Sequence, residues 1–332
     1  MLLKVSRPQS RSTRQSRTER IKSMLWNIMV GPETPEALPR LPMAALASLP
    51  DWEHVDDSMA NVLPLDEGIT DEEALKKHVL QVQAEAYAVF PYTCIRRFVF
   101  IRSVLPFIPS YERLLKLGKD RETAILLDIG CCFGNDVRCA VSDGFPAKQI
   151  VTSDLHAEFW NLGHKLFCST ADTFPARFIP GNVFDPVHLA AHPIIYSSTM
   201  LHPIPDLSAL TSLNPLRGHV SAIHASNFFH LFHEEQQAHI ARALAGLLSP
   251  EPGSMILGVH MIATEKGYKA ESLESDSGEG VVTMFHHSPE SWSELWDGQV
   301  FKEGTVEVET NLIYRDMAGE SAPFLQWCVT RL

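Results

Sequence analysis

From about residue 121 onward, short apolar runs alternate with segments in which apolar residues recur at helical spacing. Four of these runs have the length of buried strands and end at a polar or small residue: 125–128, 149–154, 176–181 and 220–226. The segments 159–167 and 240–248 carry apolar residues three or four positions apart, which is typical of one face of a helix. Strands that alternate with helices in this way predict an α/β fold built on a parallel sheet.

Three further segments near the C-terminus extend the predicted sheet: 254–261, 305–314 and 323–330. Ahead of the first strand, the run Thr-Asp-Glu-Glu at 70–73 has the form of a capping box and predicts a helix that ends near Phe90. A second helical segment is expected over about 95–117, interrupted by Pro106 and Pro109. We expect these accessory helices to cover the active site.

The pattern divides the chain into three parts. Residues 1–69, which are rich in proline and serine, are expected to form a basic tail and a linker. Residues 70–120 are expected to form an accessory helical cap, and residues 121–332 the main domain. Within the main domain, 185–217 is expected to be a loop-rich insertion and 270–280 a mobile lid or surface loop, and simple connections are the equally weighted alternative.

The formal net charge is −12, although the first 24 residues carry seven basic residues and only one acidic residue. The rest of the chain is therefore even more acidic, which disfavours nucleic acid as a partner because its phosphates would be repelled. The apolar runs fall short of the ~18–20 residues that a membrane span needs. A small-molecule substrate is the expected partner, and the oligomeric state stays open.

The six cysteines show no CxxC spacing, so we expect neither a zinc cluster nor another metal site. Cys131 and Cys132 are adjacent, which excludes an ordinary disulfide between them, and we interpret both as small packing residues of a loop. Without a visible signal peptide, the protein is expected in the reducing cytoplasm. The basic start leaves a mitochondrial presequence open, and a solvated tail is favoured over it.

The first predicted strand ends at Asp128 and runs through a turn of small residues into a helix. Glycines at 130 and 134 allow the backbone to approach a nucleotide-like ligand. A dinucleotide fingerprint would need two more glycines, where the chain has Cys132 and Asn135. A P-loop would need Lys followed by Ser or Thr after the last glycine, and that pair is missing. The pattern that remains is Asp-x-Gly-x-x-x-Gly.

Polar groups also follow the next three predicted strands. Asp154 comes twenty residues after Gly134, a spacing that suits a carboxylate accepting hydrogen bonds from two ribose hydroxyls. Asn182 and Val183 follow the third strand, where an amide and an apolar neighbour suit the amine and the face of an adenine. The fourth strand runs into Asn-Phe-Phe-His at 227–230. Because carboxyl ends of parallel strands share one edge of a sheet, we expect these groups to meet there.

Several phrases of the sequence resemble the fungal small-molecule methyltransferases found beside polyketide and meroterpenoid biosynthetic enzymes: 90–96, 127–134, 153–155, 181–185, 223–232 and 248–254. The resemblance covers about residues 80–332. It implies the Rossmann-like seven-stranded sheet of class I methyltransferases with its last strand antiparallel, S-adenosylmethionine (SAM) as cofactor, and O-methylation. The residues assigned to the cofactor are Asp128, Gly130, Cys131, Gly134, Asp154, Leu155, Asn182, Val183 and Ser226.

The acceptor side has its own candidate residues. Tyr92 and Arg96 are expected to hold an acidic substrate, although a surface ion pair is an equally weighted role for the arginine. His230 follows the fourth strand and is the candidate general base or orienting group, whereas His224 is expected in the core or beside the cofactor. The Asn/Asp-Pro-Pro-Tyr/Phe motif of amine methylation is absent, which favours a carboxyl or hydroxyl acceptor. The remaining candidates for the substrate pocket are Asn227, Phe228 and Phe229.

Two other functions stay open at this point. A nicotinamide-dependent oxidoreductase would share the strand, loop and helix, although the missing third glycine argues against it. A catalytically silent SAM-binding regulatory protein would share the cofactor site but lack a substrate pocket.

Overall fold

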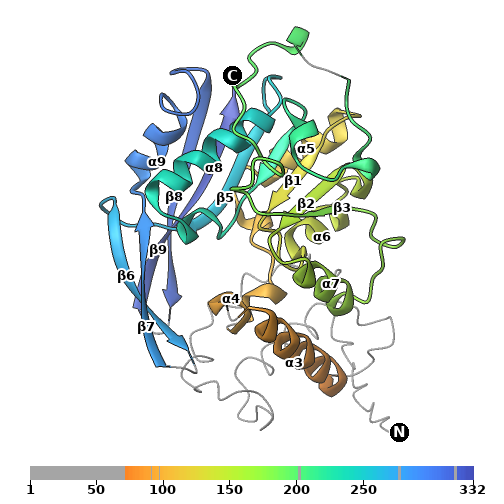
Figure 1. The fold of residues 1–332 in the computed structure, drawn as a ribbon, viewed down its shortest axis with the longest axis vertical. Coiled ribbons are helices and arrows are strands. Elements are labelled where there is room, and N and C mark those ends of the chain that lie inside the picture. Colours follow the sequence, from red (N-terminus) through yellow and green to blue (C-terminus); the bar gives the residue numbers. More distant parts are fainter. Residues whose placement is uncertain (1–71, 91, 97, 201–202, 276–277, 318–319) are drawn as a thin grey trace, which may run out of the picture.

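The computed structural model describes residues 72–90, 92–96, 98–200, 203–275, 278–317 and 320–332. Its centre is a seven-stranded sheet of order β3-β2-β1-β4-β5-β9-β8 (Figure 1). The strands are β1 (Leu126–Ile129), β2 (Ile150–Asp154), β3 (Arg177–Pro180), β4 (Ala222–His224), β5 (Met255–Met261), β8 (Val306–Met317) and β9 (Glu320–Arg331). β1 to β5 run parallel, and β9 lies antiparallel between β5 and β8. The predicted α/β sheet with its antiparallel last strand is confirmed.

Helices cover both faces of the sheet, since alternate residues of each strand point to opposite sides. On one face, Leu126 and Ala222 pack with residues of α5 (Tyr111–Asp120), α6 (Asn135–Ser142) and α7 (Ala157–Leu166). On the other face, Leu127 and Ile223 pack with α8 (Glu234–Leu247) and α9 (Pro289–Trp296). The sheet therefore has two apolar cores, and its polar chemistry is confined to the strand ends.

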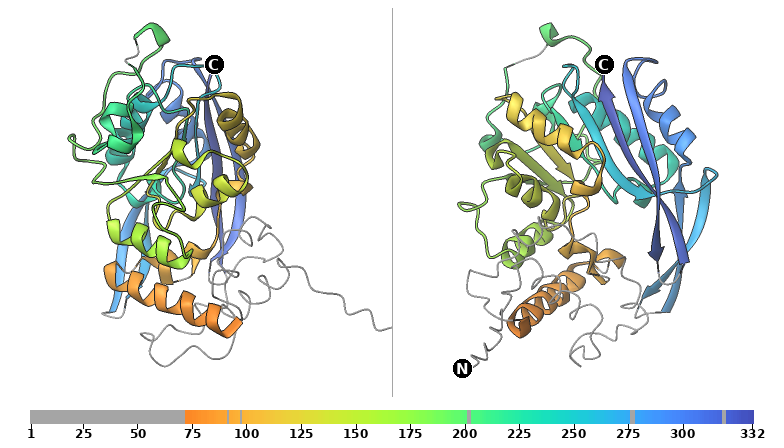
Figure 2. Two further views of the ribbon diagram at one scale, coloured as in Figure 1. Left: turned by 90° about the vertical axis from the view of Figure 1, so that its right-hand side faces the viewer. Right: turned by 180° about the vertical axis from the view of Figure 1, so that it is seen from behind.

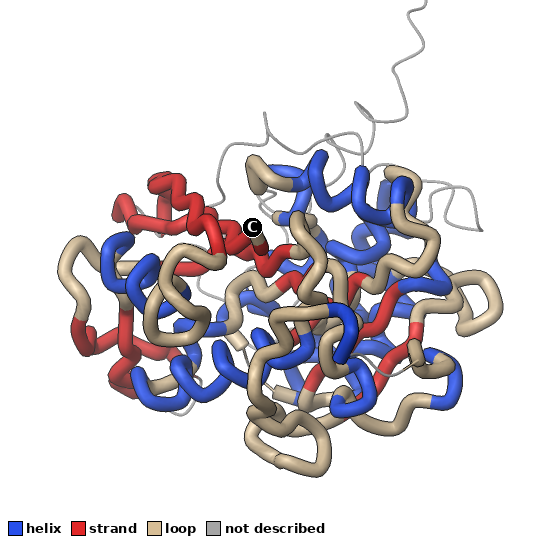
Figure 3. Tube along the Cα trace, turned by 90° about the horizontal axis from the view of Figure 1, so that it is seen from above, coloured by secondary structure: helices blue, strands red, loops and turns tan. Residues whose placement is uncertain are grey.

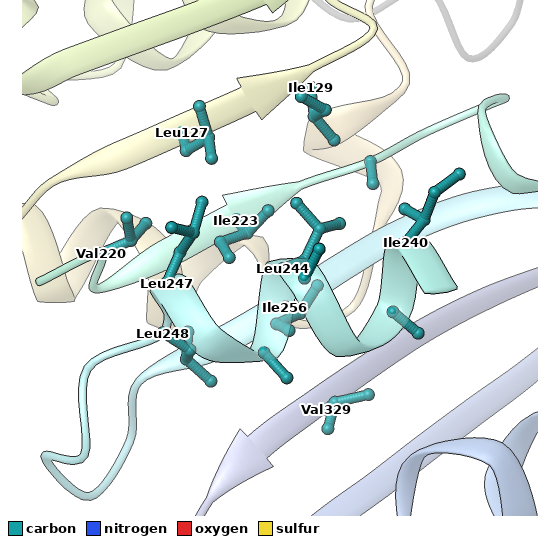
Figure 4. Close-up of a cluster of buried hydrophobic side chains, with 14 of the residues drawn as sticks. Leu127, Ile129, Val220, Ile223, Ile240, Leu244, Leu247, Leu248, Ile256 and Val329 are labelled. Atoms are coloured by element: carbon teal, nitrogen blue, oxygen red, sulfur yellow. The ribbon is translucent and has the colours of Figure 1, made fainter. Parts of the chain in front are cut away.

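The packing of α8 shows how firmly the central strands are held. Ile240, Leu244 and Leu247 recur on one face of the helix, and they lie over Ile223 and Ile256 of the sheet (Figure 4). All five side chains are fully buried. Burying a side chain of this size contributes roughly 1.5–3 kcal/mol. This face of α8 therefore holds β4 and β5 firmly in position.

The N-terminal helices α3 (Glu72–Val89) and α4 (Thr93–Arg96) pack against α7 and the loop after β1. Val82 of α3 and Ile95 of α4 share one buried cluster with Phe133 of the loop and Phe159 of α7. Both helices lie at the end of the sheet toward which the parallel strands point (Figures 1 and 2). The predicted helix end near Phe90 is confirmed, whereas its predicted start falls outside the described residues.

The helix predicted over 95–117 is present only near its two ends. Between α4 and α5 the chain makes two 3-10 turns, η3 (Val99–Ile101) and η4 (Leu105–Phe107). Phe98 takes a left-handed conformation with φ 54°, which ends helical continuation, and Pro109 precedes the start of α5.

The segment expected as a lid or surface loop is instead a hairpin of β6 (Gly267–Ser275) and β7 (Gly278–His286). Tyr268 and Phe285 face each other across it, with ring centroids 5.2 Å apart. Such aromatic cross-strand pairs stabilise antiparallel strands, and the polar composition of 270–280 hid this pairing. The hairpin lies at the same end of the sheet as α3 and α4 (Figures 1 and 2).

The connection from β3 to β4 is loop-rich as expected (Figure 3). Its described residues form three short 3-10 turns, η6 (Ser198–Met200), η7 (Leu207–Ala209) and η8 (Asn214–Leu216). Leu189 and Leu213 anchor it in the core beneath α8. In the part of the chain that the structure describes, no helix is both long and apolar enough to cross a bilayer.

Candidate active site

The loop between β1 and α6 is held by hydrogen bonds from its own backbone. Gly130 N and Cys131 N donate to the carbonyl oxygen of Ser153, at 2.8 and 3.2 Å. Cys132 N donates to Asp154 Oδ2 at 2.9 Å, and Gly134 N donates to the carbonyl oxygen of Cys131. These N–H groups are engaged within the protein, so they do not form the row of donors that a pyrophosphate needs. The loop suits a ligand without phosphates.

The two loop glycines are required by conformation and by packing. Gly130 and Gly134 have φ of 71° and 70°, which L side chains rarely adopt. A Cβ at Gly130 would lie 2.6 Å from the ring of Phe228, and a Cβ at Gly134 would lie 2.6 Å from the ring of Trp160. The space beside both glycines is therefore filled by protein side chains, a constraint that the sequence did not reveal.

Asp154 stands at the end of β2 and is only partly buried. Its Oδ1 accepts the N–H of His156 at 3.0 Å, in addition to the bond from Cys132 to Oδ2. Each carboxylate oxygen keeps further acceptor capacity, so the group remains able to accept two hydroxyl protons. The next residue, Leu155, is 58% exposed. An exposed apolar side chain at this position suits stacking against a planar base.

Tyr92 lies beside Asp154, on the cofactor side of the edge. Its ring centroid is 5.9 Å from that of Phe159 and 6.3 Å from that of His156. Burial and the Asp154 charge raise the pKa of Tyr92 to about 12, so its hydroxyl stays protonated. Arg96 ends α4, and its side chain lies outside what the structure describes.

The end of β3 offers less than expected. Asn182 is exposed, but its Oδ1 already accepts the N–H of Phe184 at 3.0 Å within a tight turn. Val183 is 8% exposed and belongs to the core on the α8 face. An adenine amine would have to share the Asn182 oxygen, and the Val183 side chain presents little surface to a base.

Asp128 does not face outward from the sheet. Its carboxylate is 3% exposed and lies 2.8 Å from Nδ1 of His224, its register partner on β4. The other imidazole nitrogen, Nε2, lies 2.6 Å from Oγ of Ser226, which also accepts the N–H of Val259 at 3.1 Å. Cys131, a neighbour in the loop, packs its side chain into the α6 core. Asp128 and Cys131 therefore support the cofactor loop from beneath.

The chain turns sharply after β4. Asn227 has φ 51°, and its N–H donates to the carbonyl oxygen of Val259 at 2.7 Å. Phe228 folds back over Gly130, whereas Phe229 is fully buried. Phe229 was expected to line a substrate pocket, whereas its ring packs within a cluster of buried aromatic side chains: His260, Trp292, Trp296 and Trp327.

His230 lies near His260 at the end of β5, a residue that the sequence analysis missed. His260 Nδ1 accepts the indole N–H of Trp327 at 3.0 Å, which places its ring proton on Nε2. Burial, and then the charges of His230, His287 and His286, lower the pKa of His260 well below its usual value. His260 is therefore a neutral donor beside His230. The sequence did contain a signal for His260, because it is a polar residue near the end of a predicted strand.

His287 has a structural role instead. Its Nδ1 lies 2.9 Å from Oγ of Ser291, in the first turn of α9. Burial, and then Lys266, lower its pKa to about 4, so it is neutral. No three His, Cys, Asp or Glu side chains in the described ranges are grouped to hold a metal ion.

Two arginines outside the predicted set also reach this edge. The carbonyl oxygen of Arg102 accepts a hydrogen bond from the side chain of Asn135, at the start of α6. Arg315, near the end of β8, lies 5.0 Å from the ring centroid of Phe324. Burial and the neighbouring charge of Arg315 lower the pKa of Arg102 to about 10. Their meeting could not be read from the sequence, because more than two hundred residues separate them.

The residues at this edge fit SAM. The half-buried Asp154 carboxylate suits its ribose, the exposed Leu155 suits its adenine, and the internally bonded loop suits a nucleoside without phosphates. When bound, SAM supplies an activated methyl group. Of the predicted residues, the edge brings together Gly130, Asp154, Leu155, Tyr92, Ser226, Asn227, Phe228 and His230.

Comparisons with known proteins identify a family match and several relatives of the chain. Residues 49–101 match the family model of the meroterpenoid methyltransferase N-terminal domain, which begins ahead of the predicted cap. The chain is 32% identical to the asnovolin E/chermesin D methyltransferase nvfJ of Aspergillus novofumigatus, covering 85% of this chain and 86% of that protein.

Other relatives carry related names. The chain is 29% identical to O-methyltransferase phiE of Fungal sp. (strain ATCC 74256), covering 74% of each protein. It is 30% identical to methyltransferase ausD of Penicillium brasilianum, covering 70% of this chain and 72% of that protein. The strand order, the site and these relatives together show that the chain belongs to the family of SAM-dependent methyltransferases of fungal secondary metabolism.

Proposed function

We propose that this methyltransferase transfers the methyl group of SAM to a carboxyl or hydroxyl oxygen of a small secondary metabolite. The observation that carries the proposal is the run Asn-Phe-Phe-His at 227–230, which begins three residues after the end of β4. Amine methyltransferases place a proline-bearing motif there, with groups that accept protons from nitrogen. Here the positions are taken by a left-handed Asn227, by Phe228 over the loop and by Phe229 in the core.

The relatives support the same class of substrate. One is named an O-methyltransferase, and another acts on asnovolin E and chermesin D. An apolar acceptor suits the aromatic rings of Phe228 and Phe232, which follow β4. We assign Asp154 to the ribose, Leu155 to the adenine and Ser226 to the amino-acid part of the cofactor.

Between the two oxygen acceptors, the charges favour a carboxylate. Arg102 and Arg315 lie close together beside α6, where the carboxylate of Asp136 acts on Arg315, and two positive charges of this kind would attract an anionic acceptor. A carboxylate is already ionised at neutral pH and needs no general base, whereas a hydroxyl does. For a carboxylate, His230, which lies near the neutral and buried His260, orients the nucleophilic oxygen. Good alignment of the two reactants is worth ~7–11 kcal/mol in reactions of this type.

The test is turnover of matched acceptors. The purified protein is incubated with SAM and with a terpenoid carboxylic acid, the corresponding alcohol and the corresponding amine. Mass spectrometry of the products should show methylation of the acid, with the alcohol slower and the amine unmodified. Methylation of the amine alone, or of carbon, would contradict the proposal.

A further inference from the structure

One group of buried polar residues goes beyond what methyl transfer by itself requires. Asp128 and His224 face each other on adjacent central strands, with Oδ1 and Nδ1 2.8 Å apart, and they are 3% and 2% exposed. A buried charged pair is costly to desolvate, and apolar residues of similar size would be about as stable there. Fold stability therefore does not explain the pair.

The pair is connected to the surface of the site through a single hydroxyl. His224 Nε2 lies 2.6 Å from Ser226 Oγ, and Ser226 is the first residue of this chain of contacts that is partly exposed. The same Oγ accepts the N–H of Val259 at 3.1 Å. All three side chains lie on the α6 face of the sheet, next to the loop at 130–134.

Hydrogen-bond counting shows what the imidazole does to this hydroxyl. A hydroxyl has one proton and two acceptor positions, and the Val259 N–H occupies one acceptor position. If His224 is an imidazolium, its Nε2 proton fills the second position, and the Ser226 proton is left to bind a ligand. If His224 is neutral with its proton toward Asp128, Nε2 takes the Ser226 proton instead. Ser226 then offers only a lone pair.

The surroundings of His224 favour the imidazolium. Burial alone lowers the pKa of His224, but the carboxylate of Asp128 on β1, and then that of Asp136 on α6, outweigh it, and the pKa is raised. Asp154 at the end of β2 is a further carboxylate that acts on Asp128. On β5, the register partner of His224 is the apolar Leu257. A raised pKa means that the imidazolium persists to higher pH than in an ordinary histidine and is lost as the pH rises above that pKa.

We propose that Ser226 Oγ donates a hydrogen bond to the carboxylate of the cofactor's amino-acid moiety, and that Asp128 and His224 are positioning residues that keep this hydroxyl a donor. The proposal rests on the cofactor placement given above. A carboxylate is favoured over an amine because both acceptor positions of Oγ are filled. The imidazolium behind the hydroxyl adds a favourable charge.

The test compares two ligands and two serine variants. S-adenosylhomocysteine carries the carboxylate, and 5′-methylthioadenosine has the same nucleoside without it. Affinities are measured by calorimetry between about pH 6 and 8.5, where the ligand carboxylate stays ionised. Ser226→Ala is compared with Ser169→Ala, because Ser169 Oγ also bonds a histidine, His164 at 2.9 Å, but follows α7 and, within the described part of the chain, has no hydrogen bond to the loop at 130–134.

S-adenosylhomocysteine should bind the wild type more weakly as the pH rises, and Ser226→Ala should bind it roughly 10-fold or more weakly at low pH with that pH dependence reduced. Ser169→Ala should retain the wild-type profile, and methylthioadenosine should bind all three proteins equally. Equal pH profiles for wild type and Ser226→Ala would overturn the inference. If neither ligand binds the wild type, the cofactor placement itself has failed.

A measurement on the wild type alone covers the case in which Ser226→Ala does not fold. NMR of protein labelled with nitrogen-15 in histidine follows the protonation of His224. Since coupling between two sites is reciprocal, S-adenosylhomocysteine should raise the pKa of His224 and methylthioadenosine should not. An unchanged pKa with bound S-adenosylhomocysteine would contradict the proposal.

Discussion

The ends of β1 and β2 and the ends of β4 and β5 lie at one edge of the sheet but are built differently. At β1 and β2, backbone N–H groups of Gly130 and Cys132 bond to Ser153 and Asp154 of the neighbouring strand. At β4 and β5, the contacts are between aromatic and histidine side chains, such as His260 with Trp327. The first region depends on backbone shape, and the second depends on which side chains are present.

This difference separates two functions of the site. A region fixed by backbone geometry suits a cofactor that never changes, whereas a region lined by side chains suits an acceptor that differs from enzyme to enzyme. Substitutions in the first region should therefore change cofactor affinity, and substitutions in the second should change turnover of the acceptor, except at Ser226, which is assigned to the amino-acid part of the cofactor.

The largest effect is expected from Gly130→Val in the cofactor region. Its Cβ would lie 2.6 Å from the Phe228 ring, and its φ of 71° is unfavourable for valine. Calorimetry should detect no binding of S-adenosylhomocysteine. Gly304→Val is the control, because Gly304 has a similar φ of 74° but open space around it. Normal binding by a folded Gly130→Val protein would show that this loop does not shape the site.

A variant in the acceptor region distinguishes the two acceptors, with a loss that is large only for a hydroxyl. If the acceptor is a carboxylate, His230→Ala should lower kcat only modestly, with S-adenosylhomocysteine affinity unchanged, because only positioning is lost. A hydroxyl acceptor predicts a loss of ~10²–10⁴ in kcat, with a wild-type rate that rises with pH. The pH–rate profiles of both proteins on the same acceptor decide between them. A changed affinity of His230→Ala for S-adenosylhomocysteine would instead contradict the assignment of the two regions to the cofactor and the acceptor.

Asp154→Ala tests the ribose contact in the cofactor region. Loss of a charged acceptor should weaken S-adenosylhomocysteine binding by roughly 1.5–3 kcal/mol, or about 10- to 100-fold. Asp185→Ala is the control, since Asp185 also follows a strand and accepts a backbone N–H, that of Val187 at 2.9 Å. Equal affinities of the two variants would remove Asp154 from the ribose site.

The smallest effect concerns the acceptor region. Trp327→Phe removes the N–H that donates to His260, whereas Trp292→Phe shortens a buried indole whose N–H has no partner among the described residues. Trp327→Phe should therefore be less stable than Trp292→Phe by about 0.5–1.5 kcal/mol in chemical denaturation. It should also raise KM for the acceptor while leaving cofactor affinity intact. Equal stabilities would mean that the hydrogen bond to His260 contributes nothing.

The fold was largely predictable because the central strands are short apolar runs with helices between them, as at 125–128 and 220–226. The antiparallel last strand was also predicted. The hairpin of β6 and β7 was not, because a polar hairpin shows no apolar alternation, and its stabilising pair Tyr268 and Phe285 joins positions seventeen residues apart.

The site was predictable where a side chain follows a strand directly. Asp154 and Leu155 lie where the sequence placed them, partly or largely exposed at the end of β2. Asp128 lies within β1, where the alternation of side chains along the strand directs it at His224, and the turn at Asn227 sends Phe229 inward. Contacts such as that of Trp327 with His260 depend on distant strands meeting, which spacing along the chain does not encode.

A crystal structure of the protein with S-adenosylhomocysteine tests most directly whether the ends of β1 and β2 hold the cofactor and the ends of β4 and β5 hold the acceptor. The account predicts both ribose hydroxyls within hydrogen-bond distance of the Asp154 carboxylate, the adenine against Leu155, and the thioether sulfur facing His230. A nucleoside bound away from Asp154, or lying against His260 and Trp327, would contradict it.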